Sequence, residues 1–285
     1  MGKKLIADSG STKTDWCLID GNKFYYFKTQ GLNPFFFNQI QITEILRNEL
    51  QIQLPIIEFD EISFFGSGCT PGEKCDLIKA SLLDVFKSNK IEVTNDLLGA
   101  AKGLAKQNEG IILILGTGSN SGSYDGKKII EQVSSLGYLL GDEGSGSRIG
   151  KQLLADYFRN KMPIELANFF SSSFKLTTSS ELLKQIFQQH HQGKYLASFA
   201  KFALENKDNE YIKILIQKEF NLLFEEVIMA YNKTAHNIYA TGSIAFYFEN
   251  ELKKAAEKFD YKIALVKQSP IEGLAEYFSK YETNG

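Results

Sequence analysis

The residues best suited to chemistry form a short polar turn close to the N-terminus. An apolar run leads into Asp8, small polar residues and a glycine follow from Ser9 to Thr14, and a second apolar run starts at Trp16. This pattern is typical of strand, turn and strand. Backbone N–H groups and hydroxyls in such a turn can converge on an anion, because glycine has no Cβ to keep a ligand away. Asp8 would repel a phosphate unless a Mg²⁺ ion lay between them, directly or through water. For this stretch taken alone, a tight hairpin with solvated polar residues is the simpler interpretation.

Glycine-rich loops follow an expected strand at four places, near Gly10, Gly68, Gly116 and Gly242. In α/β proteins, loops at the ends of strands commonly build ligand sites at the edge of a sheet. Two known fingerprints do not fit. No G-x-G-x-x-G opens a helix after the first strand, which counts against a dinucleotide-binding Rossmann domain. The segment 145–151 lacks the first glycine of the P-loop spacing, and Gln replaces the Ser or Thr that should follow its lysine.

Several acidic and amide side chains near these loops each have two interpretations. Asp96 follows a strand at the start of a helix, where either Asn95 or Asp96 could be the N-cap, and the other interpretation of Asp96 is a general base. Asp142 lies in a Gly-Asp-Glu-Gly segment whose backbone freedom suits ligand approach, and a solvated turn is the alternative. Asn33 and Asn120 could bind sugar hydroxyls or be ordinary turn asparagines. The residues alone leave these alternatives open.

Composition narrows the class of protein. A length of 285 residues allows one large domain or two smaller ones. The net charge of −2 gives no support for a nucleic-acid or membrane-binding surface. Three cysteines, Cys17, Cys69 and Cys75, are too few for a disulfide framework and show no metal spacing. No apolar segment precedes the first strand and none is long enough to span a bilayer, so the cytoplasm is the expected location.

The elements expected to position these residues form two similar runs. The first reads βββ-α-β-α-β-α, with the hairpin followed by a strand at 23–29, a helix at 40–50, a strand at 62–66, a helix at 76–89, a strand at 91–94 and a helix at 96–106. The second opens with an apolar strand at 111–115, a polar turn at 116–123 and a strand at 128–133. Two such units suggest an internal duplication. Two lobes facing each other would place both turns in one cleft, a preferred position for a small-molecule site.

The rest of the chain is mostly helical between residues 151 and 235. A third polar loop at 137–147 leads into a helix near Arg148, and helices are expected at 182–189, 196–204 and 211–231. A strand at 238–240, a helix at 244–259 and a strand at 262–266 follow. A terminal helix at 271–281 begins after Pro270, which is favoured in a first helical turn.

Together the loops resemble those of the superfamily of sugar kinases, actin and heat-shock chaperone ATPases. The segment 8–14 (DSGSTKT) is similar to its first phosphate loop, 115–120 (LGTGSN) to its second, and 240–245 (ATGSIA) to its adenosine loop. Three further segments, 31–34 (GLNP), 94–97 (TNDL) and 141–145 (GDEGS), are similar to the N-acetylglucosamine kinase branch of the BadF/BadG/BcrA/BcrD ATPase family. The similarity runs in order along nearly the whole chain.

The resemblance implies an α/β fold of two ribonuclease-H-like, actin-like ATPase lobes with mixed sheets around a nucleotide cleft. Residues 1–110 plus a returning helix within 269–285 would form the N-terminal lobe, and 111–268 the C-terminal lobe with a helical insertion. The implied activity is transfer of the γ-phosphoryl group of ATP to the 6-hydroxyl of an amino sugar, first of all N-acetylglucosamine. ATP and Mg²⁺ are the implied cofactors. The expected partner is that small molecule, not nucleic acid or a membrane, and a homodimer is left open.

The resemblance also implies a role for each matched residue. Asp8 would hold Mg²⁺ through water, and Asp96 would be the base that takes the proton from the sugar hydroxyl. The phosphates would be bound by Ser11, Thr12, Lys13, Thr117 and Gly118, the adenosine by Gly242 and Ser243, and the sugar hydroxyls by Asn33, Asn120 and Asp142. The chain departs from the family pattern at Ser9 and Ser11, where glycines are common, and at Thr241-Gly242-Ser243, where Gly-Gly is common.

Two other functions are compatible with this fold. An ATPase that activates a radical enzyme would need thiolate ligands for an iron–sulfur cluster after the second phosphate loop, and no cysteine follows Cys75. A non-catalytic sugar or nucleotide sensor is the other, because a fold does not fix a function. The presence of both Asp8 and Asp96 favours catalysis. The sequence does not distinguish N-acetylglucosamine, glucosamine, N-acetylmuramic acid and glucose.

Overall fold

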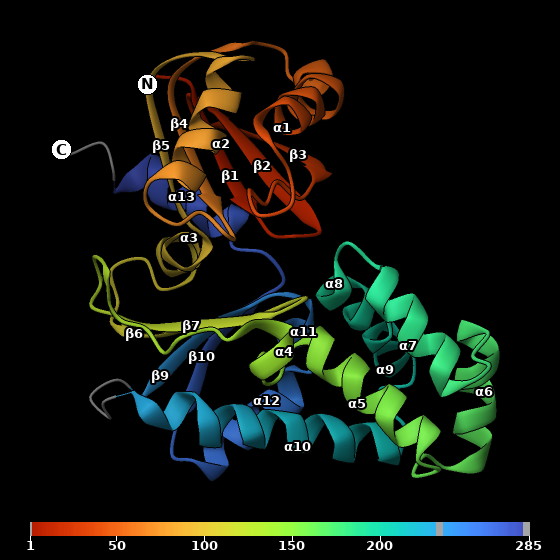
Figure 1. The fold of residues 1–285 in the computed structure, drawn as a ribbon. Helices are drawn as coiled ribbons and strands as arrows, with labels where there is room; N and C mark the ends of the chain where they lie inside the picture. Colours follow the sequence, from red (N-terminus) through yellow and green to blue (C-terminus); the bar gives the residue numbers. More distant parts are fainter. Residues whose placement is uncertain (1, 232–235, 282–285) are drawn as a thin grey trace. The chain divides into compact units, whose positions relative to one another are not determined.

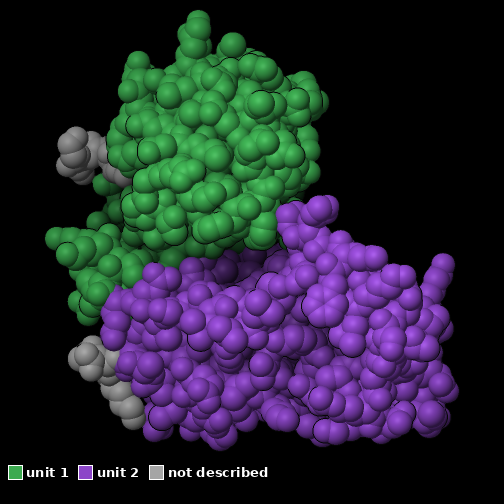
Figure 2. Space-filling view, viewed as in Figure 1, with its two compact units in different colours: residues 1–112, 122–130, 269–285 green, residues 113–121, 131–268 purple. Residues whose placement is uncertain are grey.

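The computed structural model describes residues 2–231 and 236–281 and has an α/β fold (Figure 1). The chain divides into two compact units, which Figure 2 distinguishes by colour. Unit 1 comprises residues 1–112, 122–130 and 269–285, and unit 2 comprises residues 113–121 and 131–268. The described residues form two five-stranded sheets, with strand orders β3-β2-β1-β4-β5 and β10-β9-β6-β7-β8.

The first sheet combines an antiparallel meander with two parallel strands. Its strands are β1 (Lys4–Ser9), β2 (Lys13–Asp20), β3 (Lys23–Gln30), β4 (Glu58–Gly66) and β5 (Lys87–Asn95). Strands β4 and β5 run parallel to β1, and the register places Ser9 opposite Gly66 and Gly66 opposite Asn95. The carboxyl ends of three parallel strands therefore reach the same edge of the sheet.

Helices cover both faces of this sheet, because successive strand residues point to opposite sides. Leu5 and Trp16 pack on the face covered by α1 (Gln39–Ile45) and α2 (Glu73–Leu83). Ile6 and Cys17 pack on the other face, against α13 (Ile271–Lys280), which also packs on α3 (Asp96–Leu104). The last helix thus completes the core of unit 1.

The second sheet consists of β6 (Gly110–Leu115), β7 (Ser119–Tyr124), β8 (Ile129–Glu131), β9 (Asn237–Thr241) and β10 (Lys262–Lys267). The helices between them are α4 (Gly137–Leu140), α5 (Gly146–Phe158), α6 (Ile164–Phe174), α7 (Ser179–Gln188), α8 (Gln192–Ser198), α9 (Ala200–Glu205), α10 (Glu210–Glu226), α11 (Ser243–Tyr247) and α12 (Glu249–Lys258). A ring cluster that includes Phe170, Phe174, Phe199 and Phe202 joins α6 to α8 and α9. This gives the helical region its own apolar core.

The expected order of strands and helices in the first run is confirmed, but several boundaries differ: the strand expected at 62–66 starts at Glu58, and the helix expected at 76–89 starts at Glu73. The helix expected at 76–89 ends at Leu83, and Lys87 already belongs to β5. Lys87 and Lys90 pair across the strands with Glu58 and Glu61, at 2.8 Å in both cases. Pairing with the neighbouring strand thus outweighs local helix preference in a segment that has no apolar pattern to mark it.

Further boundaries in the second half also differ from expectation. The polar turn expected at 116–123 is confined to 116–118, because β7 starts at Ser119 although its sequence is poor in strand-forming residues. The helix expected at 196–204 is divided into α8 and α9, and the helix expected at 244–259 into α11 and α12. The helix expected at 211–231 ends at Glu226. Residues 232–235, at the end of the expected helical region, lie outside the described residues. None of the helices within 2–231 and 236–281 is long and apolar enough to cross a membrane.

One buried ion pair joins two helices of unit 2. Arg148 Nε on α5 donates to Glu219 Oε2 on α10 at 3.1 Å, and Glu219 is 2% exposed. Burial raises the pKa of Glu219, while the Arg148 charge and hydrogen bond act in the opposite direction.

We expect Arg148→Ala to lower the free energy of unfolding by about 2–4 kcal/mol, because removal of one partner leaves a buried carboxylate uncompensated. The loss should be greater at high pH. A carboxyl group whose pKa is raised by folding stabilises the protein only below that pKa, where it is protonated. Urea unfolding at pH 5 and pH 8 measures both effects. As a control, Lys201→Ala breaks the exposed Lys201–Glu205 pair and should change stability by less than about 0.5 kcal/mol.

Candidate functional site

Three acidic residues lie close together in unit 1. Asp8 is opposite Asp15 in the β1–β2 register, and Asp96 begins α3 directly after β5. The pKa of Asp8 is raised to about 8, mainly by burial and then by the charges of Asp15 and Asp96, whereas Lys13 and a hydrogen bond with Ser269 act in the opposite direction. The structure therefore brings together Asp8 and Asp96, which the sequence analysis selected from separate segments.

The N-cap interpretation of Asp96 is wrong, because the neighbouring residue has that role. Asn95 Oδ1 accepts a hydrogen bond from Leu98 N at 2.9 Å, which makes Asn95 the N-cap of α3. Asp96 is the first residue inside the helix, where the helix dipole favours a negative charge. Its carboxylate is therefore not used as the cap.

Asp15 adds a second buried carboxylate beside Asp8, although the described residues contain no group of three or more His, Cys, Asp or Glu side chains placed to hold a metal ion. Asp15 is 3% exposed, and its Oδ2 accepts a bond from Lys13 Nζ at 2.5 Å. Among the described residues Asp15 Oδ1 has no hydrogen-bond partner, although it is buried. Mutually repelling carboxylates with an unsatisfied oxygen are hard ligands of the kind that Mg²⁺ prefers. The sequence analysis gave Asp15 no role, although the period-2 alternation of a strand places it on the same side as Lys13.

Hydrogen bonds from residues 31 and 32 hold the first turn in place. Ser9 Oγ and Thr14 Oγ1 are 2.8 Å apart, and Leu32 N donates to Ser9 Oγ at 3.0 Å. Gly31 N donates to Thr12 O at 3.1 Å. A Cβ on Gly31 would lie 2.2 Å from Gly10 O, so only glycine allows this close approach.

We expect Gly31→Ala to distort the first turn and to lower the free energy of unfolding by about 1–3 kcal/mol, the usual cost of overpacking. The resemblance assigns this turn to the phosphates of a nucleotide, so we also expect nucleotide affinity to fall, because the clash is with the backbone of the turn. Thermal unfolding and nucleotide titration measure the two effects. Gln30 is adjacent and exposed and offers a control, since Gln30→Ala should change neither the free energy of unfolding nor the nucleotide affinity. A stable Gly31→Ala variant with normal affinity would contradict the prediction.

Asn33 links the first turn to the loop after β4. Its Nδ2 donates to Ser11 Oγ at 3.1 Å and to Ser67 Oγ at 3.2 Å. Its Oδ1 accepts from Phe35 N at 2.9 Å, and the side chain is buried. Ser67 was not among the predicted site residues; its position immediately after a strand that ends beside Ser9 is the signal that could have found it.

The second turn, residues 116–118, is held by α5 and by Asp142 in unit 2. Gly146 N donates to Gly116 O, and Ser147 N donates to Thr117 O, both at 2.9 Å. Asp142 Oδ1 accepts from Ser119 N at 3.1 Å, and Oδ2 accepts from Ser147 Oγ at 3.0 Å. Burial raises the pKa of Asp142, while these two hydrogen bonds lower it. Ser147, like Ser67, was not predicted.

The expected adenosine loop lies against the end of β6. Gly242 has a φ of +102°, and a Cβ there would lie 2.2 Å from Leu115 O, so both conformation and contact require glycine. Ser243 starts α11 directly after it. The structure therefore brings Gly242 and Ser243 close to the second turn within unit 2.

Two other glycines in the turns are not required by packing. A Cβ on Gly116 would meet no atom within 4 Å, and one on Gly10 would meet only Lys13 O at 3.7 Å. Neither residue has a positive φ in the range that favours glycine. Neither packing nor φ therefore explains these two glycines. The explanation that is left is the close approach of a ligand to the backbone at both positions. The space at Gly10 and Gly116 thus leaves the backbone of each turn open to a ligand.

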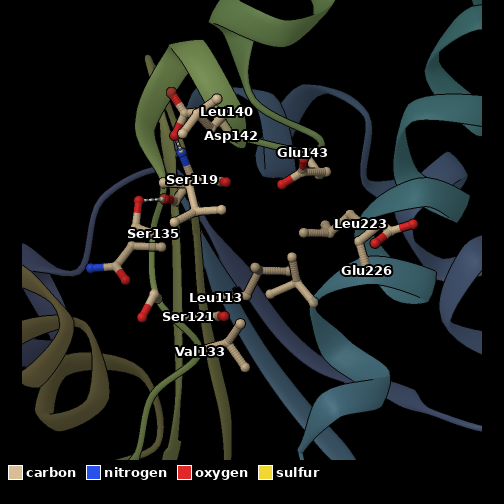
Figure 3. A pocket seen from close by; sticks show the side chains of 14 residues that line it. Leu113, Ser119, Ser121, Val133, Ser135, Leu140, Asp142, Glu143, Leu223 and Glu226 are labelled. Atoms are coloured by element: carbon tan, nitrogen blue, oxygen red, sulfur yellow. Dashed lines mark hydrogen bonds between the residues drawn. The ribbon is translucent and has the colours of Figure 1, made fainter.

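A cavity of about 150 Å³ lies in unit 2 beside the second turn (Figure 3). Asn120 and Asp142 both line it, and Leu113, Leu223 and other apolar residues form part of its wall. Asn120 Oδ1 accepts a bond from Gln132 Nε2 at 2.8 Å. Two of the residues predicted to bind sugar hydroxyls thus share one cavity, whereas Asn33 belongs to unit 1.

Comparison with known proteins identifies the class of this fold. No protein-family model and no curated protein sequence matches the chain. Among solved structures, a "putative N-acetylglucosamine kinase" from Porphyromonas gingivalis is 35% identical, with a TM-score of 0.88 and coverage of 98% of this chain and 99% of that one. A protein of the same description from Chromobacterium violaceum is 15% identical, with a TM-score of 0.76 and coverage of 97% and 99%.

A more distant structure is a ROK family glucokinase from Streptomyces griseus, which contains glucose and AMPPNP. It is 14% identical, with a TM-score of 0.54 and coverage of 96% of this chain and 98% of that one. The fold is thus the two-lobed, ribonuclease-H-like fold of sugar kinases and actin-like ATPases, as the resemblance implied. The chain belongs to the N-acetylglucosamine kinase-like family within that class.

Proposed function

We propose that the chain is an ATP-dependent kinase that transfers the γ-phosphoryl group to the 6-hydroxyl of an amino sugar, N-acetylglucosamine. One observation carries the proposal: the glycine turn, the cation-compatible pair Asp8 and Asp15, and Asp96 meet at one edge of the first sheet. Similarity over 98% of the chain to a relative that is described as a "putative N-acetylglucosamine kinase" supports the choice of reaction. The fold relative that contains glucose and AMPPNP supports a sugar and a nucleotide as the two ligands.

In this proposal the protein contributes positioning and charge, which are the main requirements of phosphoryl transfer. Mg²⁺, when bound, neutralises phosphate charge, and Asp8 is its proposed ligand through water. Phosphate contacts are assigned to Ser11, Thr12, Lys13, Thr117 and Gly118, and adenosine contacts to Gly242 and Ser243. Asp96 takes the proton of the sugar 6-hydroxyl. The role of binding the sugar hydroxyls is assigned to Asn33, Asn120 and Asp142.

The proposed partners are therefore small molecules, without nucleic acid or membrane. A kinase of this type draws on the ATP of the cytoplasm, which is its proposed location. Members of the BadF/BadG group that activate radical enzymes need a cluster held by thiolates, and the chain has only Cys17, Cys69 and Cys75. We therefore place sugar phosphorylation ahead of that alternative and of a non-catalytic sensor.

The test is ADP release with Mg²⁺-ATP across a panel of N-acetylglucosamine, glucosamine, N-acetylmuramic acid and glucose. The proposal predicts release that depends on sugar, strongest with N-acetylglucosamine, and NMR of the product should show phosphate on carbon 6. ADP release without any sugar would instead indicate an activator ATPase. Binding of sugar or nucleotide with no ADP release would indicate a sensor.

A further inference from the structure

The cavity in unit 2 carries an unbalanced charge. All of its lining residues belong to unit 2, and three of them are acids, Asp142, Glu143 and Glu226. Among the described residues that line it, none is Lys, Arg or His. A ligand in this cavity therefore has carboxylates around it and no cation in the wall.

The three carboxylates come from two segments of the chain. Asp142 and Glu143 lie between α4 and α5, and Glu226 is the last residue of α10. In the view of Figure 3 the side chain of Glu143 lies between those of Asp142 and Leu223. Glu143 is half-buried, whereas Glu226 is exposed. Because solvent and salt screen an exposed charge more strongly, Glu143 should have the larger effect on a ligand.

The charge of Glu143 acts on its neighbours in unit 2. Burial is the main cause that raises the pKa of Asp142 and the pKa of Glu219, and the charge of Glu143 contributes to both shifts. Two of the described cations lie in this region. Arg148 is paired with Glu219 at 3.1 Å, and the Lys151 ammonium donates to a backbone oxygen at 2.7 Å. Lys151 therefore offsets only part of the charge of the three lining carboxylates.

The remainder of the cavity wall is neutral, and much of it is apolar. Its apolar lining residues are Leu113, Val133, Leu136, Leu140, Leu223 and Val227. Such a wall packs well against the C–H groups of a sugar or the methyl group of an acyl substituent. It does not replace the water around a carboxylate, and an anion buried without a cation loses hydration energy. The cavity therefore suits a neutral ligand and resists an anion.

We propose that Glu143, together with Asp142 and Glu226, excludes sugars that carry a carboxylate and so restricts the kinase to neutral and cationic sugars. The inference rests on the proposed function, in which Asn120 and Asp142 bind the sugar in this cavity. Glu143 is the specificity-determining residue, and it acts by repulsion of the wrong ligand. N-acetylglucosamine is neutral, whereas N-acetylmuramic acid has a lactyl carboxylate, so the cavity separates these two sugars.

A pair of ligands that differ in charge tests the repulsion directly. The methyl ester of N-acetylmuramic acid keeps the lactyl carbon skeleton and removes the charge. In calorimetric titrations of the full chain we expect the ester to bind about 10-fold more tightly than the acid, or more, and Glu143→Gln to lower this ratio by about 3- to 10-fold. Glu226→Gln should lower it by about 2-fold, because that side chain is exposed. Each ratio compares two ligands of one variant, so a general effect of the substitution on the cavity cancels.

Ionic strength gives a second readout for the same pair. Repulsion between charges is screened by salt, whereas a steric difference between acid and ester is not. The ratio of the two Kd values in the unaltered protein should therefore fall toward one between about 0.01 M and 1 M salt. This readout needs no variant, so the proposal stays testable if Glu143→Gln does not fold.

A cationic ligand should respond with the opposite sign. At about pH 6 glucosamine is a cation, because amines of this kind lose their proton near about pH 8. The affinity for glucosamine relative to glucose should fall by about 3-fold in Glu143→Gln, since an attractive carboxylate is removed. If the lactyl group is too large for the cavity and neither muramic ligand binds, this ratio decides the question, and an unchanged value overturns the proposal.

The neighbour of Glu226 on α10 provides a matched control. Glu225 pairs with Lys258 at 3.8 Å and does not line the cavity. Glu225→Gln makes the same chemical change one residue away and should leave both ratios unchanged.

The possible results separate this inference from the proposed function. Equal affinity for acid and ester in the unaltered protein, or the same ratio in Glu143→Gln, overturns the role of Glu143. If N-acetylglucosamine is phosphorylated in that case, the kinase assignment is unaffected. If no sugar of the panel binds or supports ADP release, the proposed function itself fails, and the inference fails with it.

Discussion

Asp96→Asn is expected to lower kcat by about 10²- to 10⁴-fold, the range that a general base contributes. The amide has the same shape but cannot accept the proton of the sugar hydroxyl. KM for the sugar should change little if the side chain acts mainly in the transition state. The fold should persist because Asn95, not Asp96, caps α3. Steady-state kinetics and thermal unfolding measure these effects.

An equivalent acid elsewhere in unit 1 provides the control. Asp76 lies in the first turn of α2 and is exposed. Asp76→Asn makes the same chemical change at a similar position in a helix, and kcat should stay unchanged. Near-normal turnover of Asp96→Asn would remove Asp96 from the role of base.

Asp8→Asn is expected to produce a loss of comparable size for a different reason. A catalytic metal supplies several kcal/mol of transition-state stabilisation, and 1.36 kcal/mol corresponds to a factor of ten, so we expect a loss of about 10²- to 10⁴-fold in kcat. The concentration of Mg²⁺ needed for half-maximal residual activity should rise. Asp96→Asn should not change that requirement, which separates the two roles.

The thermal stability of Asp8→Asn should rise, although its kcat falls. Burial and the charges of Asp15 and Asp96 disfavour the ionised form of Asp8. At a pH above 8, where Asp8 is ionised, a neutral amide removes that repulsion, so the metal-free variant should unfold at a higher temperature than the unaltered protein, and the difference should shrink as the pH falls below 8. Asp20→Asn, at the exposed end of β2, should change neither activity nor melting temperature. Full activity of Asp8→Asn at low Mg²⁺ would contradict the assigned role.

Local sequence patterns predicted the hairpin well, because alternation and a glycine-containing turn act over a few residues. The boundary between α2 and β5 was not predictable in this way. Residues 87–90 are Lys-Ser-Asn-Lys, and what places them in a strand is the pairing with Glu58 and Glu61, residues nearly thirty positions earlier. The start of β7 at Ser119 was hidden for a similar reason, since its small polar residues carry no strand pattern of their own.

The candidate site, like the fold, could be predicted from the sequence only in part. Asp8 and Asp96 could be selected from the sequence because each follows a strand, and motif resemblance then suggested their roles. The supporting residues were not selected, and the signal for Ser67, its position after a strand that ends beside Ser9, depends on strand pairing that the sequence does not show. Ser67 and Ser147 are ordinary loop and helix-start serines in the sequence, and only the folded chain brings them to Asn33 and Asp142. The contact of Ser67 with Asn33 spans 34 residues, whereas Ser147 and Asp142 are 5 residues apart and meet through the conformation of the turn before α5.

The most direct test of the central claim is a crystal structure of the full chain with Mg²⁺ and AMPPNP. The account predicts phosphate oxygens within hydrogen-bond distance of the first turn at Ser11–Lys13 and of the second turn at Thr117 and Gly118. It also predicts the metal next to Asp8. A nucleotide bound elsewhere, or phosphates that contact neither turn, would contradict the account.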